Sequence, residues 1–466
     1  MSKRTLIAVL AVGVLIVGAC SSRGETDDAA TTTTAGGGAT ADDANFGTLE
    51  SPCGPGDATI DAAQNGGATD VINVGTPTDK GFETQPGLNL EMEDAAKAFI
   101  GWCNEQGGVQ GLPLNLVELD AGVFNVPAVM EQACEEVFAL VGGGLVLDNG
   151  VFPRFHECDM IDIAGFTVST EKAMSNGMAQ PLPNPSNIKP RGWFEWAAEN
   201  YPEEVQRTAV LYGDAGSIAV TARQEIETME SLGTIEIVDE ISYSTLGEAN
   251  WAPFAQRLKD NNIGFMTFVG QPANLVSLLR SMNEIGYRPP LIIQQTNFYD
   301  TVLTEGAGDL AEGIFVRTSY TPFEETDRNP AMAKYIANME KYNPGGKIAG
   351  LGVQGTSAYL LFVTAANKCL DEGDGVLERE CVLAAAKSIT SWDGGGLHAP
   401  GNPAENLGAN CELMLQVSGG EFVRVYPELG SADDNGNGWH CSELGRAELT
   451  GDYGDVTAGV DPSRPN

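Results

Sequence analysis

Residues 104–120 decide the fold of this chain, and they read Asn-Glu-Gln-Gly-Gly-Val-Gln-Gly-Leu-Pro-Leu-Asn-Leu-Val-Glu-Leu-Asp. Residues 88–105 have the apolar spacing of an amphipathic helix, and residues 114–119 alternate as a half-buried strand does. Gly107, Gly108 and Gly111 permit the tight left-handed turns that are needed between a helix end and a strand. The stretch therefore predicts a helix, a tight turn and a strand in direct succession.

The same alternation of short apolar runs and longer amphipathic runs continues along the chain. The expected strands are residues 71–76, 114–119, 138–141, 161–165, 208–212, 235–242, 265–269, 291–294 and 313–317. The expected helices are residues 88–105, 127–137, 217–232, 251–261 and 272–285. Repeated strand-helix-strand order indicates parallel sheets with right-handed crossovers, so the expected fold class is α/β.

The elements fall into two blocks, about 70–187 and 205–318, which the proline-rich residues 181–190 separate. The remaining expected elements are helices at 329–343, 351–370 and 377–389 and a hairpin of 413–417 with 422–426. This tail is too small for a third lobe, so we expect the first two to share it. The predicted division is a lobe of 70–187 plus 319–390, a lobe of 188–318 plus 391–430, and a C-terminal tail of 431–466, with a hinge between the two parallel-sheet lobes.

The N-terminal residues 1–19 have the pattern of a signal peptide. Lys3 and Arg4 precede an uncharged run, 6–19, that is too short to span a bilayer. Gly18 and Ala19, followed by Cys20, resemble the lipobox of bacterial lipoproteins, which implies lipidation of Cys20 and attachment outside the cell membrane. Residues 20–69 are expected to form a flexible linker and an N-terminal extension.

Charge and cysteine content limit the function further. The 466 residues include 26 Lys and Arg against 64 Asp and Glu, a net charge of -38, which excludes nucleic acid as a plausible partner. Apart from Cys20 the cysteines are Cys53, Cys103, Cys134, Cys158, Cys369, Cys381, Cys411 and Cys441. In an oxidising compartment they suggest four disulfides, whose pairing the count leaves open. With no C-x-x-C and three His, no metal site or cofactor is expected.

Three motifs resemble a known family. Residues 104–111, followed by the strand 114–120, resemble the segment after the first helix in type I periplasmic binding proteins of the branched-chain amino acid class. Residues 79–82 and 138–144 resemble an actinobacterial branch of that family, and the similarity extends from about 51 to 430. The resemblance implies a solute-binding protein with sheets ordered 2-1-3-4-5, which closes on a solute by hinge motion.

That sheet order implies a disulfide map. The first and second helices then lie on opposite faces of the sheet, which disfavours a bond between Cys103 and Cys134. Cys158 precedes the fourth strand on the face of the second helix, so Cys134 with Cys158 is expected. The remainder suggests Cys53 with Cys103, Cys369 with Cys381, and Cys411 with Cys441.

A solute is expected at the carboxyl ends of the strands, where loops present backbone N–H groups. The first lobe would contribute Asp79, Lys80, Phe82, Leu145, Phe166, Thr167 and Ser169. The second would contribute Asp214, Ser217, Gln271, Gln295 and Thr296.

The resemblance also implies roles for these residues. Thr167 and Ser169 fall where the family binds the carboxylate, and Gln295 stands where the family has the acid that binds the ammonium. Because a neutral amide does not offset an ammonium, an amide, urea-like, hydroxylated or small carboxylate solute suits the site at least as well as a branched-chain amino acid does.

Two functions remain open. The first is a monomeric, extracytoplasmic, membrane-anchored lipoprotein that delivers a small polar solute to the ABC permease subunits of an importer. The second is a sensor of the same fold that reports the solute to a membrane receptor or kinase. No catalytic residues are expected, since no nucleophile motif is present. Residues 433–438 resemble the start of a calcium loop, but Leu444 occupies the position of the required acid.

Overall fold

The first lobe is built on a sheet of five parallel strands in the order β3-β2-β4-β5-β6. The computed structural model describes residues 44–152 and 154–464. The strands are β2 (Ile72–Thr78), β3 (Leu114–Asp120), β4 (Ala139–Val141), β5 (Asp162–Ile163) and β6 (Met178–Ala179). This confirms the expected order 2-1-3-4-5. The predicted strand at 161–165 is shorter than expected, because only Asp162 and Ile163 pair with both neighbours.

The turn at Gly107–Gly111 has the conformation that its glycines predict. Helix α2 (Leu90–Gln106) ends at Gly107, whose φ is 115°, and Gly111 has a φ of 93°. A Cβ on Gly111 would lie 2.1 Å from the carbonyl oxygen of Gly56, so only glycine fits. The Asn104 amide accepts from the Leu114 N–H at 2.8 Å and donates to the Leu114 carbonyl at 2.9 Å, which fixes the strand against the helix end.

The second lobe repeats the same parallel order and adds an antiparallel edge. Its parallel strands follow β9-β8-β10-β11-β12, and β14 and β15 continue the sheet beyond β12. The strands are β8 (Thr208–Gly213), β9 (Ile237–Tyr243), β10 (Phe265–Val269), β11 (Leu291–Gln294), β12 (Phe315–Thr318), β14 (Cys411–Ser418), β15 (Glu421–Tyr426) and β16 (His440–Cys441). The antiparallel pairing of β14 with β15 confirms the hairpin predicted from 413–417 and 422–426.

Helices cover both sheets. The first lobe has α2, α3 (Val126–Glu136), α4 (Arg154–Glu157), α5 (Thr170–Ala173), α11 (Pro330–Tyr342), α12 (Gly350–Glu372) and α13 (Arg379–Ala386). The second has α6 (Gly192–Asn200), α7 (Gly216–Glu230), α8 (Ala252–Asp260), α9 (Pro272–Glu284) and α10 (Thr301–Ala307). Helix α13 begins at Arg379 and not at Leu377, because β13 (Val376–Leu377) pairs with β1 (Thr59–Ile60) of the N-terminal extension. Within the described ranges no helix is both long and apolar enough to cross a membrane.

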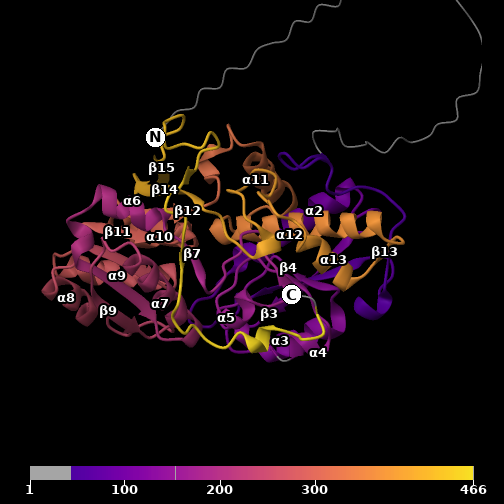
Figure 1. Cartoon of the computed structure of the whole chain (residues 1–466), viewed down its shortest axis with the longest axis horizontal. Helices are drawn as coiled ribbons and strands as arrows, with labels where there is room; N and C mark the ends of the chain where they lie inside the picture. Colours follow the sequence, from indigo (N-terminus) through magenta and orange to yellow (C-terminus); the bar gives the residue numbers. More distant parts are fainter. Residues whose placement is uncertain (1–43, 153, 465–466) are drawn as a thin grey trace, which may run out of the picture. The chain divides into compact units, whose positions relative to one another are not determined.

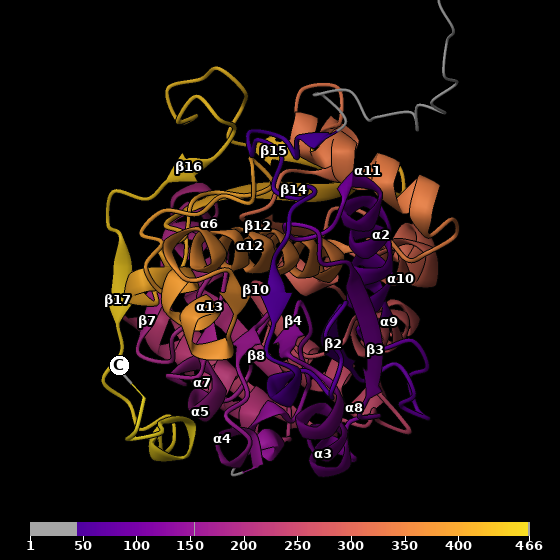
Figure 2. The same ribbon diagram turned by 90° about the vertical axis from the view of Figure 1, so that its right-hand side faces the viewer.

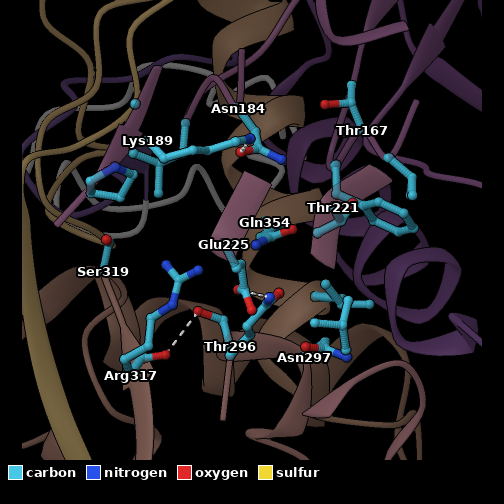
Figure 3. Close-up of a pocket in the computed structure, with 18 of the residues that line it drawn as sticks. Thr167, Asn184, Lys189, Thr221, Glu225, Thr296, Asn297, Arg317, Ser319 and Gln354 are labelled. Atoms are coloured by element: carbon cyan, nitrogen blue, oxygen red, sulfur yellow. Dashed lines mark hydrogen bonds between the residues drawn. The ribbon is translucent and has the colours of Figure 1, made fainter. Parts of the chain in front are cut away.

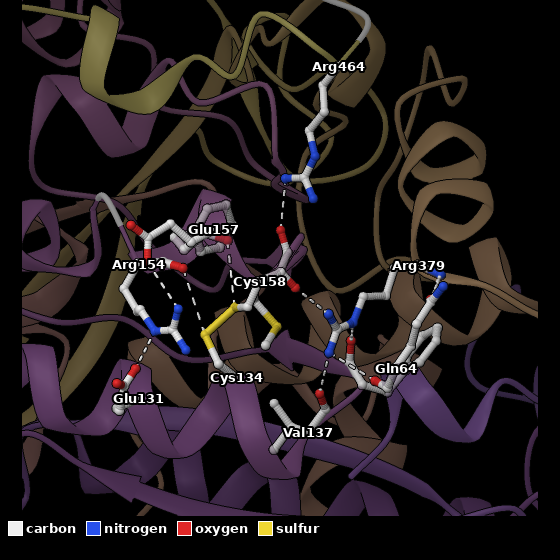
Figure 4. The surroundings of a disulfide bond; sticks show 12 residues. Gln64, Glu131, Cys134, Val137, Arg154, Glu157, Cys158, Arg379 and Arg464 are labelled. Atoms are coloured by element: carbon white, nitrogen blue, oxygen red, sulfur yellow. Dashed lines mark hydrogen bonds and ion pairs between the residues drawn. A yellow bond between two sulfur atoms is a disulfide. The ribbon is translucent and has the colours of Figure 1, made fainter. Parts of the chain in front are cut away.

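All four disulfides join the cysteines that the family resemblance implied. They are Cys53–Cys103, Cys134–Cys158, Cys369–Cys381 and Cys411–Cys441. Figure 4 shows Cys134–Cys158 with its ionic surroundings. The nearby Arg379 guanidinium donates to the carbonyl oxygens of Phe138, Cys158, Gln64 and Val137, so one buried side chain ties α13 to the end of α3 and to the extension.

Three segments, 180–187, 319–329 and 387–410, cross between the lobes. The second and third crossovers run side by side, since Ala399 N–H donates to Ser319 at 2.8 Å and Thr321 N–H to Leu397 at 2.9 Å. At the first crossover, β7 (Ile188–Pro190) pairs with β17 (Arg446–Glu448) (Figure 2).

Residues 446–464, here named the C-terminal strap, connect the lobes once more. The strap starts at β17, and the Thr450 and Gly451 N–H groups donate to Glu227 of α7 in the second lobe. It then reaches the first lobe, where its Tyr453 carbonyl accepts from Thr170 at 2.7 Å and Arg464 donates to the Met160 carbonyl at 2.8 Å. Figure 1 shows this course in yellow, from the region of β7 to that of α4.

Candidate functional site

A cavity of about 280 Å³ lies where the carboxyl ends of the strands of both lobes meet (Figure 3). The first lobe contributes residues after β4, β5 and β6, among them Val146, Phe166, Thr167 and Gln180. The second contributes the ends of β10, β11 and β12 together with α6 and α7, and the first crossover adds residues 182–184. This is the place at which open parallel sheets bind ligands.

One side of the cavity holds an ion pair. Arg317 Nη1 at the end of β12 lies 2.8 Å from Glu412 Oε1 on β14. The Arg317 guanidinium also stands 5.4 Å from the centre of the Trp193 ring, a cation-π contact. Arg317 Nε and Glu412 Oε2 are buried without a hydrogen-bond partner among the described residues. The guanidinium is therefore held in one orientation while part of its donor capacity remains free.

Lys189 is a buried ammonium with little compensation. The residue is 9% exposed, and its Nζ donates to Asn184 Oδ1 at 2.5 Å. Among the described residues no carboxylate lies within 4.0 Å of Nζ. Burial lowers the pKa of Lys189 to about 7, the positive charge of Arg317 acts in the same direction, and Glu225 opposes both.

Glu225 is the buried acid of the same cavity. It lies on α7, is 7% exposed, and accepts a hydrogen bond from the Gln295 amide. Its Oε2 has no partner among the described residues. Burial raises the pKa of Glu225 to about 7, against the lowering effects of Arg317, Gln295 and Lys189.

The remaining wall is mixed. Its apolar part consists of Phe166 from the first lobe, Trp193, Phe194 and Ile218 from the second and Leu182 from the crossover, and its polar part includes Asn184, Thr221, Asn297, Ser319 and Gln354. A cavity with a few charged groups converging on an apolar body is typical of sites for small amphiphilic molecules.

Five of the residues predicted from the sequence line this cavity, namely Phe166, Thr167, Gln271, Gln295 and Thr296. The Thr167 hydroxyl lies 3.4 Å from Gln180 Oε1. The Thr296 hydroxyl donates to the Arg317 carbonyl at 3.2 Å. The rule that places a ligand beyond the carboxyl ends of parallel strands thus selected lining residues of this cavity in both lobes.

The other predicted first-lobe residues do not line the cavity. The Asp79 carboxylate is fully buried and accepts from the N–H groups of Val123 and Val146, and burial raises its pKa to about 6. Lys80 pairs with Glu93 and Glu118, and Ser169 accepts from the Lys172 N–H as the N-cap of α5. Phe82 and Leu145 are buried in apolar clusters beside the cavity.

Two predicted second-lobe residues also lie outside the cavity. Asp214 is exposed and accepts from the Thr245 N–H at 2.9 Å. The Ser217 hydroxyl donates to the Val146 carbonyl of the first lobe at 3.0 Å. Ser217 therefore joins the two lobes next to the cavity.

The charged residues of the cavity were not predicted from the sequence. Lys189 lies in β7, within the proline-rich residues 181–190, where no periodicity indicates which side chains are buried. Glu225 carried a usable signal, because it interrupts the apolar positions Ile218, Ala222 and Met229 of α7 with a charge. Trp193 and Phe194 are both buried and part of the wall.

Comparison with known proteins agrees with this architecture. A sequence model of the family described as periplasmic binding protein matches residues 71–421. A fatty acid ABC transporter substrate-binding protein from Thermomonospora curvata superimposes with a TM-score of 0.67 at 17% identity, over 84% of this chain and 95% of that chain. A leucine-binding protein from Thermotoga maritima gives 0.63 at 15% identity, over 76% and 98%.

A branched-chain amino acid binding protein from Streptococcus pneumoniae, in complex with isoleucine, also gives 0.63 at 12% identity, over 77% and 100%. At these identities the likeness concerns the fold. No curated protein sequence matches the chain.

Proposed function

Because the chain belongs to the periplasmic binding protein family, we propose that it is the extracytoplasmic solute-binding protein of an ABC importer. In this role it binds a small solute reversibly between its lobes and delivers it to the permease subunits in the membrane. Cys20, the predicted lipidation site, would anchor it there, although this residue lies outside the described part of the chain.

The cavity shared by both lobes is the observation that carries the proposal. A solute in it contacts residues such as Thr167 of the first lobe and Gln295 of the second at once. Binding would then stabilise the closed arrangement of the lobes relative to an open one, which is the change that a permease can detect.

The solute class follows from the lining. Because Gln295 stands where the family has an acid, the second lobe was expected to lack a carboxylate for the ammonium. Glu225, which accepts a hydrogen bond from the Gln295 amide, supplies one. An α-amino acid is therefore compatible with this side of the cavity, beside amides and small carboxylates. We propose a solute of leucine size with a polar end and an apolar body, in keeping with the leucine, isoleucine and fatty acid named for the structural neighbours.

Thermal shift of the purified protein tests the proposal. The panel contains branched-chain amino acids, the corresponding amides, urea-like compounds and short carboxylates. A solute at 100 times its dissociation constant should stabilise the protein by about 2.7 kcal/mol, a readable rise in melting temperature. A panel without any shift would contradict the proposed function for these solute classes.

A further inference from the structure

We propose that the solute carries a carboxylate, and that Lys189 and Arg317 bind this group at the crossovers between the lobes. The inference rests on the proposed function and deepens it. It places the negative end of the solute beside Lys189 and Arg317 and not beside Thr167 and Ser169, the residues that the sequence led us to expect there.

The first argument is the state of Lys189. A buried ammonium costs free energy unless an anion and several acceptors compensate it. Lys189 Nζ has one acceptor, Asn184 Oδ1, although an ammonium can donate three hydrogen bonds. A carboxylate placed in the cavity would supply both the missing charge and the missing acceptor.

The second argument is the position of Arg317. Its guanidinium acts on Lys189 as a neighbouring positive charge, and the side chains of both residues line the cavity (Figure 3). Glu412 neutralises one edge of the guanidinium, but the Arg317 side chain lines the cavity and is 22% exposed, so a further N–H of the guanidinium is within reach of a solute. The two cations therefore offer an ammonium and a guanidinium N–H to one anionic group.

The third argument is that the hydroxyls of the first lobe are engaged elsewhere. The Ser169 hydroxyl caps α5 and does not line the cavity. The Thr167 hydroxyl has a neutral partner, Gln180 Oε1. Neither position offers a net positive charge, so an anionic group gains more from the crossover side.

Glu225 defines the other end of the solute. Glu225 lines the cavity and its Oε2 has no hydrogen-bond partner among the described residues, so an ammonium on the solute would compensate its charge. A carboxylate without an amino group is accommodated when Glu225 is protonated. The shared chemistry of both solutes is the carboxylate, and the two cases are separated by experiment.

Calorimetric titration with four probes of one size tests the inference: leucine, leucinamide, 4-methylpentanoate and 4-methylpentanamide. We expect at least one carboxylate to bind, and its amide counterpart to bind at least tenfold more weakly. Lys189→Gln should weaken carboxylate binding roughly tenfold to hundredfold, the range for a hydrogen bond to a charged group, and weaken amide binding less, because a neutral amide forms no charge pair with Lys189.

Two controls accompany the variant. Lys189→Arg keeps the charge and should retain carboxylate binding better than Lys189→Gln. Lys259→Gln removes a cation of α8 that lies outside the cavity and should leave all four affinities unchanged. If leucine binds and Glu225→Gln lowers the affinity for leucine, Glu225 accepts the ammonium of the solute. If 4-methylpentanoate binds and Glu225→Gln does not lower the affinity for 4-methylpentanoate, the solute has no amino group.

Two results would overturn the inference. One is that neither carboxylate binds. The thermal-shift panel then tests the proposed function separately, because a shift with another solute would show that the protein still binds a solute. The other is that a carboxylate binds equally well to the wild type and to Lys189→Gln. In that case solute binding is confirmed and the anionic group lies elsewhere.

Discussion

Glu225 provides a test at the scale of the single residue. Its pKa is raised from 4.5 to about 7, so the folded protein binds more protons than the unfolded chain between these pH values. The free energy of unfolding therefore falls as the pH rises through this window, by up to about 3 kcal/mol. Gln does not titrate, so Glu225→Gln should gain stability relative to the wild type as the pH rises from 5 to 8.

Urea denaturation at pH 5 and pH 8, without added solute, measures this difference. Glu230→Gln, on an exposed position of the same helix, is the matched control. An equal difference between Glu225→Gln and the wild type at both pH values would show that Glu225 does not titrate in this window.

The residues of the cavity show how far the sequence can predict a site. Thr167, Gln271, Gln295 and Thr296 follow predicted strands directly, so the topology places them at the strand ends. Lys189 follows no predicted element. It lies in β7, and its burial depends on the pairing of β7 with β17 from the far end of the chain. Sequence patterns describe local periodicity and carry no information on such a distant contact.

At the scale of the element, the disulfides allow a comparison of loop lengths. Cys53–Cys103 closes 50 residues and fixes the N-terminal extension to α2, whereas Cys369–Cys381 closes 12. A longer loop loses more entropy when it is closed in the unfolded chain. Replacing Cys53 and Cys103 by Ala should lower the free energy of unfolding by about 2–5 kcal/mol.

This loss should exceed that for the corresponding Cys369/Cys381 variant by about 1 kcal/mol. Chemical denaturation of both double variants under one buffer condition measures the difference. A larger loss for the Cys369/Cys381 variant would contradict the loop-length argument.

Several elements were predicted with closely matching bounds, whereas α6, α10, β7 and β13 were not predicted. The strands Phe265–Val269 and Leu291–Gln294 have the predicted bounds, because each is a short apolar run between turn residues. Strands of two or three residues, such as β7 and β13, are too short to show a period of two. Their existence depends on partner segments more than 200 residues away.

At the scale of the whole molecule, the C-terminal strap should restrict the separation of the lobes. It is bonded to Glu227 in the second lobe and to Thr170 and Met160 in the first. Opening the lobes must stretch or release one of these attachments. Deletion of residues 450–466 should therefore increase the radius of gyration of the protein without solute, as measured by small-angle X-ray scattering.

Asn176→Ala is a milder variant for the same test. It removes an amide that donates to the Asp461 carbonyl at 2.8 Å and accepts from the Asp461 N–H at 2.9 Å, and so loosens the first-lobe attachment alone. We expect a smaller change in the same direction. Unchanged scattering of the deletion variant would show that the strap follows the lobes without restraining them.

Both ends of the described chain are fastened to the first lobe. Near the N-terminus, the Phe46 ring packs 5.4 Å from Trp102 of α2 and Cys53 is bonded to Cys103, while Arg464 donates to Met160 just before β5. A pull on the residues before Phe46 therefore acts on the first lobe. If Cys20 holds the chain at the membrane, the first lobe keeps its position there. Solute capture then moves only the second lobe relative to the membrane.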